Sequence, residues 1–112
     1  PDLLAAAQTP AAELEASLTQ MFTRWGFTTV FDLASPGDNT FALRERIERG
    51  EIHGPRLLTA GDPLWTHVPI YVLDYLVTHR IVIPPTPTAE LAVARVQSLA
   101  ARGANGIKLF TG

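Results

Sequence analysis

One side chain with clear chemical potential lies near the end of the chain, in the stretch GIKLFTG at residues 106–112. Lys108 is the only lysine, whereas the other eight basic residues are arginines. An ammonium group buried in a short apolar run costs several kcal/mol unless it has a partner. We therefore expect Lys108 to be paired, neutralised or chemically modified.

Three interpretations of Lys108 follow from its chemistry. It could form an ion pair with Asp32 or another carboxylate and merely hold strand ends together, as in a non-catalytic interaction domain. As a neutral amine it could attack a substrate carbonyl to give a Schiff base, as in a lyase or aldolase. It could instead capture carbon dioxide as a carbamate, which is a carboxylate on a long stem and can bridge two divalent cations.

Four further residues are candidates for a site. Asp32 ends a predicted strand, where it could orient Lys108 or a metal-bound water, or simply cap backbone groups. His67 lies on the connection after a later strand, so we consider a metal-supporting or substrate-contacting role beside that of an ordinary loop residue. Trp65 and Tyr71 lie on the same connection and could line a substrate pocket, or pack as core or lid.

The first half of the chain predicts two helices and two strands. A helix is expected from Thr9 and Pro10 to Gly26, with the threonine hydroxyl as its cap. The β-branched and aromatic run at 27–33 predicts a strand. A second helix that is charged on its outer face is expected at about 40–49, and the apolar run PRLLTAG predicts a buried strand. The apolar face of the first helix comprises Leu14, Leu18, Met21, Phe22 and Trp25.

The second half predicts two helices and one strand. The stretch from 62 to 85 is expected to be a long connection with a helix at PIYVLDYLV. A clearer helix runs from Thr88 to Gly103, and GIKLF is the last strand. The predicted apolar face of that helix comprises Ala89, Ala92, Val93, Val96, Leu99 and Ala100.

This alternation predicts an α/β protein with a parallel sheet and crossover helices, either an open doubly wound sheet or an arc of a (β/α)₈ TIM barrel. Three strands without a closing edge make a poor independent domain, which favours an arc of something larger. The chain has no Gly-rich phosphate loop, which disfavours a nucleotide-binding open sheet. In a barrel, Gly106, Lys108 and Phe110 would share the interior face near the catalytic end.

Three stretches in order, GFTTVFDLAS, RGEIHGPRLLTAGDPL and ARGANGIKLFTG, resemble consecutive segments of the metal-dependent amidohydrolases, specifically the imidazolonepropionase- and prolidase-like group. The resemblance covers about residues 13–112. It implies a (β/α)₈ barrel that hydrolyses amide or other C–N bonds with one or two divalent metals, usually zinc. The family's lysine in this motif closes the fourth strand and, carboxylated by CO₂, bridges the metals, a role that carries over to Lys108.

Residues 1–112 are accordingly expected to be part of a catalytic barrel domain, incomplete at both ends and holding strands two to four. The resemblance places a His-x-His pair before Pro1, and further histidines and a general-base aspartate after Gly112. Zinc sites need three or more protein ligands. With one candidate ligand, this segment alone is expected to be inactive, and the remainder of the barrel is its expected partner.

Composition limits the other partners. The chain has 46% hydrophobic residues and a net charge of −2, which gives no attraction for phosphate backbones, so nucleic acid is not an expected partner. No apolar run reaches the roughly 20 residues that a membrane span needs. The absence of cysteine leaves the compartment open, and we favour the cytoplasm. A small-molecule substrate is expected, and a homo-oligomer is compatible with the composition.

Overall fold

The computed structural model describes residues 5–111, so residues 1–4 and Gly112, the two ends of the predicted domain, lie outside the described residues. Within 5–111 the chain is a mixed α/β protein with four α-helices and short parallel strands, which confirms the predicted class at that level. The elements are α1 (Ala11–Met21), the 3₁₀ turn η2 (Thr23–Trp25), β1 (Thr29–Asp32), α2 (Asn39–Glu48), β2 (Arg56–Thr59), β3 (Leu64–Trp65), α3 (Ile70–Thr78), α4 (Ala89–Ala101) and β4 (Leu109–Phe110).

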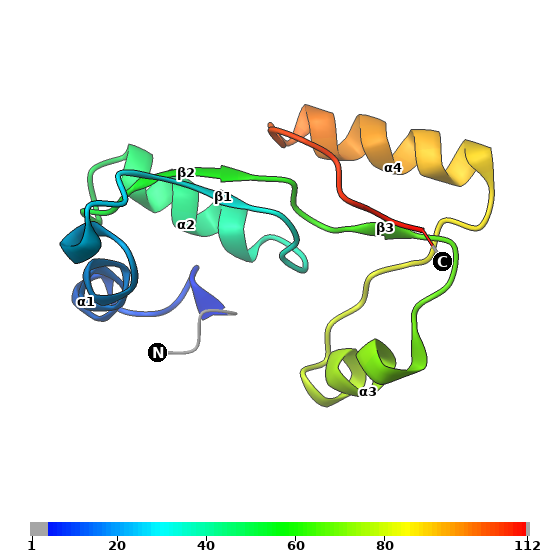
Figure 1. The fold of residues 1–112 in the computed structure, drawn as a ribbon, viewed down its shortest axis with the longest axis horizontal. Coiled ribbons are helices and arrows are strands. Elements are labelled where there is room, and N and C mark those ends of the chain that lie inside the picture. The colour runs from blue at the N-terminus through cyan, green and yellow to red at the C-terminus, as the bar shows by residue number, and fades with distance from the viewer. Residues whose placement is uncertain (1–4, 112) are drawn as a thin grey trace.

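The strands form two parallel pairs placed one after the other along an elongated molecule of 41 × 28 × 24 Å (Figure 1). In the first pair β1 lies beside β2, with Asp32 opposite Thr59. In the second pair β3 lies beside β4, with Trp65 opposite Phe110. β2 and β3 are consecutive along the chain, and each pairs with a different strand, β2 with β1 and β3 with β4.

The prediction of one long connection after β2 is wrong, because β3 lies within it. Gly61 has a φ of +67°, which turns the chain after β2. The chain then forms β3, which pairs with β4, and the Leu64 N–H donates to the carbonyl of Lys108 at 2.8 Å. A two-residue strand is too short to show an alternating pattern of its own.

The first helix differs from its prediction at both ends. Thr9 does not cap it: its hydroxyl donates to the Ala5 carbonyl at 3.0 Å, and Pro10 stands at the cap position without a side-chain bond. The helix ends at Met21 instead of continuing through Trp25. These two side chains are 44% and 64% exposed, so neither belongs to the buried face.

The predicted apolar face of α4 is only half covered. Leu99 is buried, and Ala92 and Val96 are half-buried. Val93 is 55% exposed, and Ala89 and Ala100 are exposed as well. The helix therefore contacts the rest of the described chain along a narrower stripe than its sequence indicates.

Two hydrophobic clusters stabilise the two ends of the molecule. The first lies between α1, α2 and the face of β1 and β2 that they cover, and it comprises Ala6, Leu14, Leu18, Leu43, Ile52 and Leu57. The second lies under α3 and comprises Trp65, Leu76 and Ile83. The site described below lies where these two parts of the chain meet.

Two arginines, Arg44 in α2 and Arg102 at the end of α4, connect these two helices. Arg44 donates to the Gly103 carbonyl at 2.9 Å and to the Asn105 side chain at 3.0 Å, while Arg102 pairs with Asp38. These contacts fix the turn between α4 and β4 against α2. The segment that carries Lys108 is therefore held at its start.

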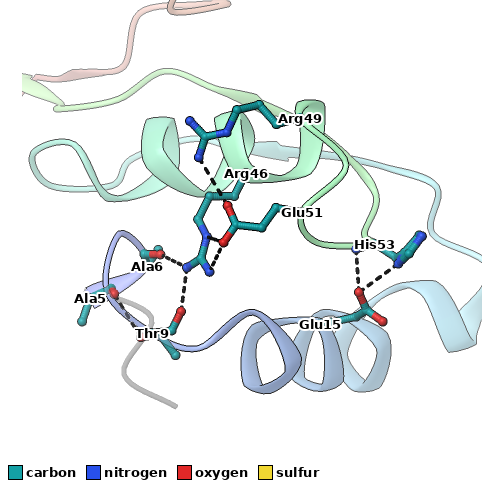
Figure 2. Close-up of polar contacts among 8 residues, drawn as sticks. All are labelled: Ala5, Ala6, Thr9, Glu15, Arg46, Arg49, Glu51 and His53. Atoms are coloured by element: carbon teal, nitrogen blue, oxygen red, sulfur yellow. Dashed lines mark hydrogen bonds and ion pairs between the residues drawn. The ribbon is translucent and has the colours of Figure 1, made fainter.

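Arg46 is a charged residue of α2 that does not lie on the outer face of this helix. It is 9% exposed, and it donates to Glu51 at 2.6 Å and to the carbonyls of Ala6 and Thr9 at 2.6 Å each (Figure 2). One guanidinium thus ties the segment before α1 to the carboxyl end of α2.

Candidate functional site

Lys108 directly precedes β4, and its carbonyl belongs to the β3–β4 ladder. Its side chain is half-buried, so the expected loss of solvation is partial. The ammonium nitrogen lies 4.8 Å from the centre of the Phe110 ring. Within residues 5–111 Lys108 forms no ion pair, so the interpretation that it pairs with Asp32 is wrong, while a pairing with a carboxylate outside these residues stays a prediction.

Asp32 is the last residue of β1, as predicted, and its oxygens already accept hydrogen bonds. One oxygen accepts from the Thr59 hydroxyl at 3.0 Å, and the other accepts from the Ala34 N–H at 3.3 Å. The structure therefore shows the capping role that was one of the two interpretations of Asp32. Asp32 locks the carboxyl end of β1 to the carboxyl end of β2.

Asp32 and Lys108 nevertheless line the same groove, which has a volume of about 610 Å³. The groove runs beside β1 and is walled by apolar side chains of α1 and α2, such as Leu18, Met21 and Leu43. Lys108 and Asp32 are its ionisable lining residues. A small amphipathic molecule could place its polar end at this pair and its apolar part against the helices.

A second, smaller hollow of about 200 Å³ brings together the other three predicted residues, Trp65, His67 and Tyr71. Trp65 is 6% exposed and stacks on Phe110, with ring centres 5.5 Å apart and an interplanar angle of 29°. His67 Nδ1 lies 3.2 Å from the Thr66 hydroxyl oxygen, and Tyr71 is 79% exposed. Trp65 thus belongs to a strand and not to the connection on which it was predicted.

Phe110 is the residue that sequence reasoning missed as a site residue. It contacts Lys108, stacks on Trp65 and lines both the groove and the smaller hollow. The alternation of side chains already placed Phe110 on the face of Lys108, which was the available signal. Its packing on Trp65 depends on the pairing of β3 with β4, which the sequence does not reveal.

Two exposed glutamates outside these hollows have shifted pKa values. Hydrogen bonds from Arg46 hold the pKa of Glu51 below its ordinary value, and Arg49 adds to this effect. The backbone N–H of His53, and then its ring, lower the pKa of Glu15 (Figure 2). The first pair joins the end of α2 to the turn that follows it, and the second joins the middle of α1 to the turn before β2. Neither pair lines the groove or the hollow.

Metal ligands are sparse in the part of the chain that the structure describes. No three His, Asp or Glu side chains gather there in a way that could hold an ion. Any metal held by Lys108 would need ligands from elsewhere.

None of the helices in residues 5–111 is both long and apolar enough to cross a bilayer.

Comparisons with family models and with curated proteins found no relative of this chain. No model of a known protein family matches the chain, and no curated protein matches it. Function must therefore be inferred from the groove, the hollow and the side chains that line them.

Proposed function

We propose that the chain supplies strands two to four, with their helices, to a (β/α)₈ barrel that hydrolyses an amide or another C–N bond. The order of its parallel segments supports this proposal. β1 pairs with β2, and Asn105, just before β4, donates to the carbonyl of Thr59 at the end of β2 at 2.7 Å. Consecutive parallel segments that lie side by side, with helices between them, are the repeating unit of such a barrel.

Uncovered apolar surface supports a larger domain as well. Ile70 and Val82 are 85% and 80% exposed, and Leu109 in β4 is 60% exposed. Exposed apolar side chains in this number on a small α/β chain favour further elements packed against them. The remaining strands and helices of a barrel would cover such surfaces.

The half-buried amine of Lys108, without an ion pair among the described residues, is the observation that carries the proposed chemistry. A neutral Lys108 amine would react with CO₂: its lone pair forms a bond to the carbon, one C=O π pair moves onto oxygen, and an N–H proton leaves to solvent. The product is a carbamate at the entrance of a groove that Asp32 also lines.

Lys108 as a carbamate would contribute oxygen ligands to a divalent metal, one or two zinc ions by the family resemblance. When bound, such a metal supplies a nucleophilic hydroxide at neutral pH and polarises the substrate carbonyl. The chain's own part is to fix the lysine stem through the β3–β4 ladder and to shield the site with the apolar walls of the groove. Asp32 keeps the ends of β1 and β2 together through its bond to Thr59.

The proposal is tested on the intact polypeptide that contains this chain. We expect Lys108→Ala to abolish hydrolysis and added acetate to restore part of it, because acetate can replace the lost carboxylate. Lys108→Arg keeps the cation and its contact with Phe110 but cannot form the carbamate, so it should be equally inactive. Full activity of Lys108→Arg would contradict the proposal, as would trapping of a substrate adduct on Lys108 by borohydride.

A further inference from the structure

The smaller hollow opens where two neighbouring strands end. Trp65 is the last residue of β3, Phe110 is the last residue of β4, and the two are register partners. Parallel strands bind their ligands at their carboxyl ends, so this position is one where a ligand is expected. Both residues line the hollow, and their rings stack on one another.

The lining of this hollow restricts what could occupy it. His67, Pro69 and Tyr71 also line it, and no Asp, Glu, Lys or Arg side chain of residues 5–111 does. A volume of about 200 Å³ exceeds that of an apolar cavity of roughly 150 Å³ that binds benzene, so a single ring fits. Edge-to-face contacts with the Phe110 ring would add to the free energy gained by burying such a ring, because the faces of Phe110 are already contacted by Trp65 and by Lys108 Nζ.

Phe110 connects this hollow with the groove of Lys108. Its ring contacts Lys108 Nζ at 4.8 Å and stacks on Trp65, and it lines both spaces. A molecule whose reacting bond lies near Lys108 would therefore have its side group one ring away from the hollow. Tyr71, at 79% exposure, is placed to cover that group from α3.

We infer that the hollow at the ends of β3 and β4 binds an uncharged aromatic side group of the substrate, and that Tyr71 and the Trp65–Phe110 pair determine this preference. The inference rests on the proposed function, because it names the substrate class of the same site. It assigns to α3 the role of a specificity element. The substrate class is an amide with a single aromatic ring on its side group.

Binding can be tested separately from hydrolysis by isothermal titration calorimetry of the intact polypeptide that carries Lys108→Ala, because this variant should not hydrolyse the ligand. N-acetylphenylalanine amide should bind in a saturable manner. N-acetylglycine amide, which lacks the ring, should bind about tenfold more weakly or not at all.

The two tyrosines of α3 provide a matched pair of variants in this background. Tyr71 lines the hollow, whereas Tyr75 contacts the His79 ring in a tilted arrangement, with ring centres 4.3 Å apart. Tyr71→Ser should weaken binding of the phenylalanine amide about tenfold, and Tyr75→Ser roughly twofold at most. Helicity measured by circular dichroism checks that both variants keep the fold.

Equal responses to the two amides, equal effects of the two tyrosine variants, or no saturable binding would each overturn the inference. Ring binding without hydrolysis in the intact polypeptide would contradict the proposed function and leave the inference intact. Hydrolysis without a preference for aromatic side groups would contradict the inference alone.

Discussion

Lys108 places its ammonium nitrogen 4.8 Å from the centre of the Phe110 ring, two residues further along the same segment. This contact stands where an ion pair with Asp32 was expected. Cation–π contacts at such partly exposed positions contribute about 0.5–1 kcal/mol, which is less than the several kcal/mol that removing a charge fully from water costs. Because Lys108 is only half-buried, its amine keeps access to solvent and to CO₂. Phe110 links the amine to Trp65.

The buried guanidinium of Arg46 predicts a large loss of stability on substitution. Arg46→Met should lower the free energy of unfolding by about 2–3 kcal/mol, because two carbonyls and the Glu51 carboxylate lose their donors. Arg49 contacts the same carboxylate at 3.3 Å but is 63% exposed, so Arg49→Met should cost less than about 0.5 kcal/mol. Urea unfolding measures both, and similar losses would contradict this account of the cluster in Figure 2.

Acid should destabilise the chain partly through Glu51. Its pKa is lowered from an ordinary 4.5 by hydrogen bonds from Arg46, so the unfolded chain takes up this proton at higher pH than the folded chain does. The contribution is complete above 4.5 and is lost as the pH falls through the lowered pKa. Glu51→Gln should flatten the dependence of unfolding free energy on pH in this range. An unchanged slope in that variant would refute the assignment.

Gly61 is predicted to be intolerant of a side chain. A Cβ there would lie 2.9 Å from the Phe41 ring and 3.0 Å from Leu99, at a φ of +67°. Gly61→Ala should therefore cost about 2–3 kcal/mol from overpacking and backbone strain together. Gly37 has a similar φ of +62° with no atom within 4 Å, so Gly37→Ala should cost only about 1 kcal/mol. Thermal unfolding of the two variants separates strain from packing, and equal losses would contradict the tight approach.

Arg80 offers a stabilising substitution. It has a φ of +53° just after α3, where the Arg80 N–H donates to Val77 and the Ile81 N–H donates to Leu76. This is the glycine position of a Schellman motif. Arg80→Gly should raise the unfolding free energy by about 0.5–1 kcal/mol, whereas Arg80→Ala keeps the Cβ and should not. A loss of stability in the glycine variant would count against this backbone assignment.

The elements that could be predicted from the sequence are those with a local signal. The helix at 40–49, the helix of the PIYVLDYLV stretch and the strand of the PRLLTAG stretch are all present as α2, α3 and β2. The exposure of Val93 could not be predicted, because periodicity identifies an apolar face but not whether anything covers it. β3 could not be predicted either, because its ladder depends on the carbonyl of Lys108 far along the chain.

The residues of the candidate site could be predicted from the sequence, but the contacts of their side chains could not. Trp65, His67 and Tyr71 were chosen because they share one connection, and the structure brings them to one hollow. The ion pair of Lys108 with Asp32 failed because the carboxylate serves Thr59 and Ala34 instead. Side-chain types and strand alternation thus locate candidates, while their partners depend on contacts between segments that are distant in sequence.

Carboxylation of Lys108 is the central claim, and ¹³C NMR of the intact polypeptide tests it directly. With ¹³C-bicarbonate and zinc present, we predict a carbamate resonance that disappears in Lys108→Ala and on acidification, because protonation of a carbamate releases CO₂. The Lys108→Arg variant serves as the control that retains the positive charge. A spectrum in which the Lys108→Ala variant shows the same resonance as the unmodified sequence, or in which neither shows one, would contradict the claim.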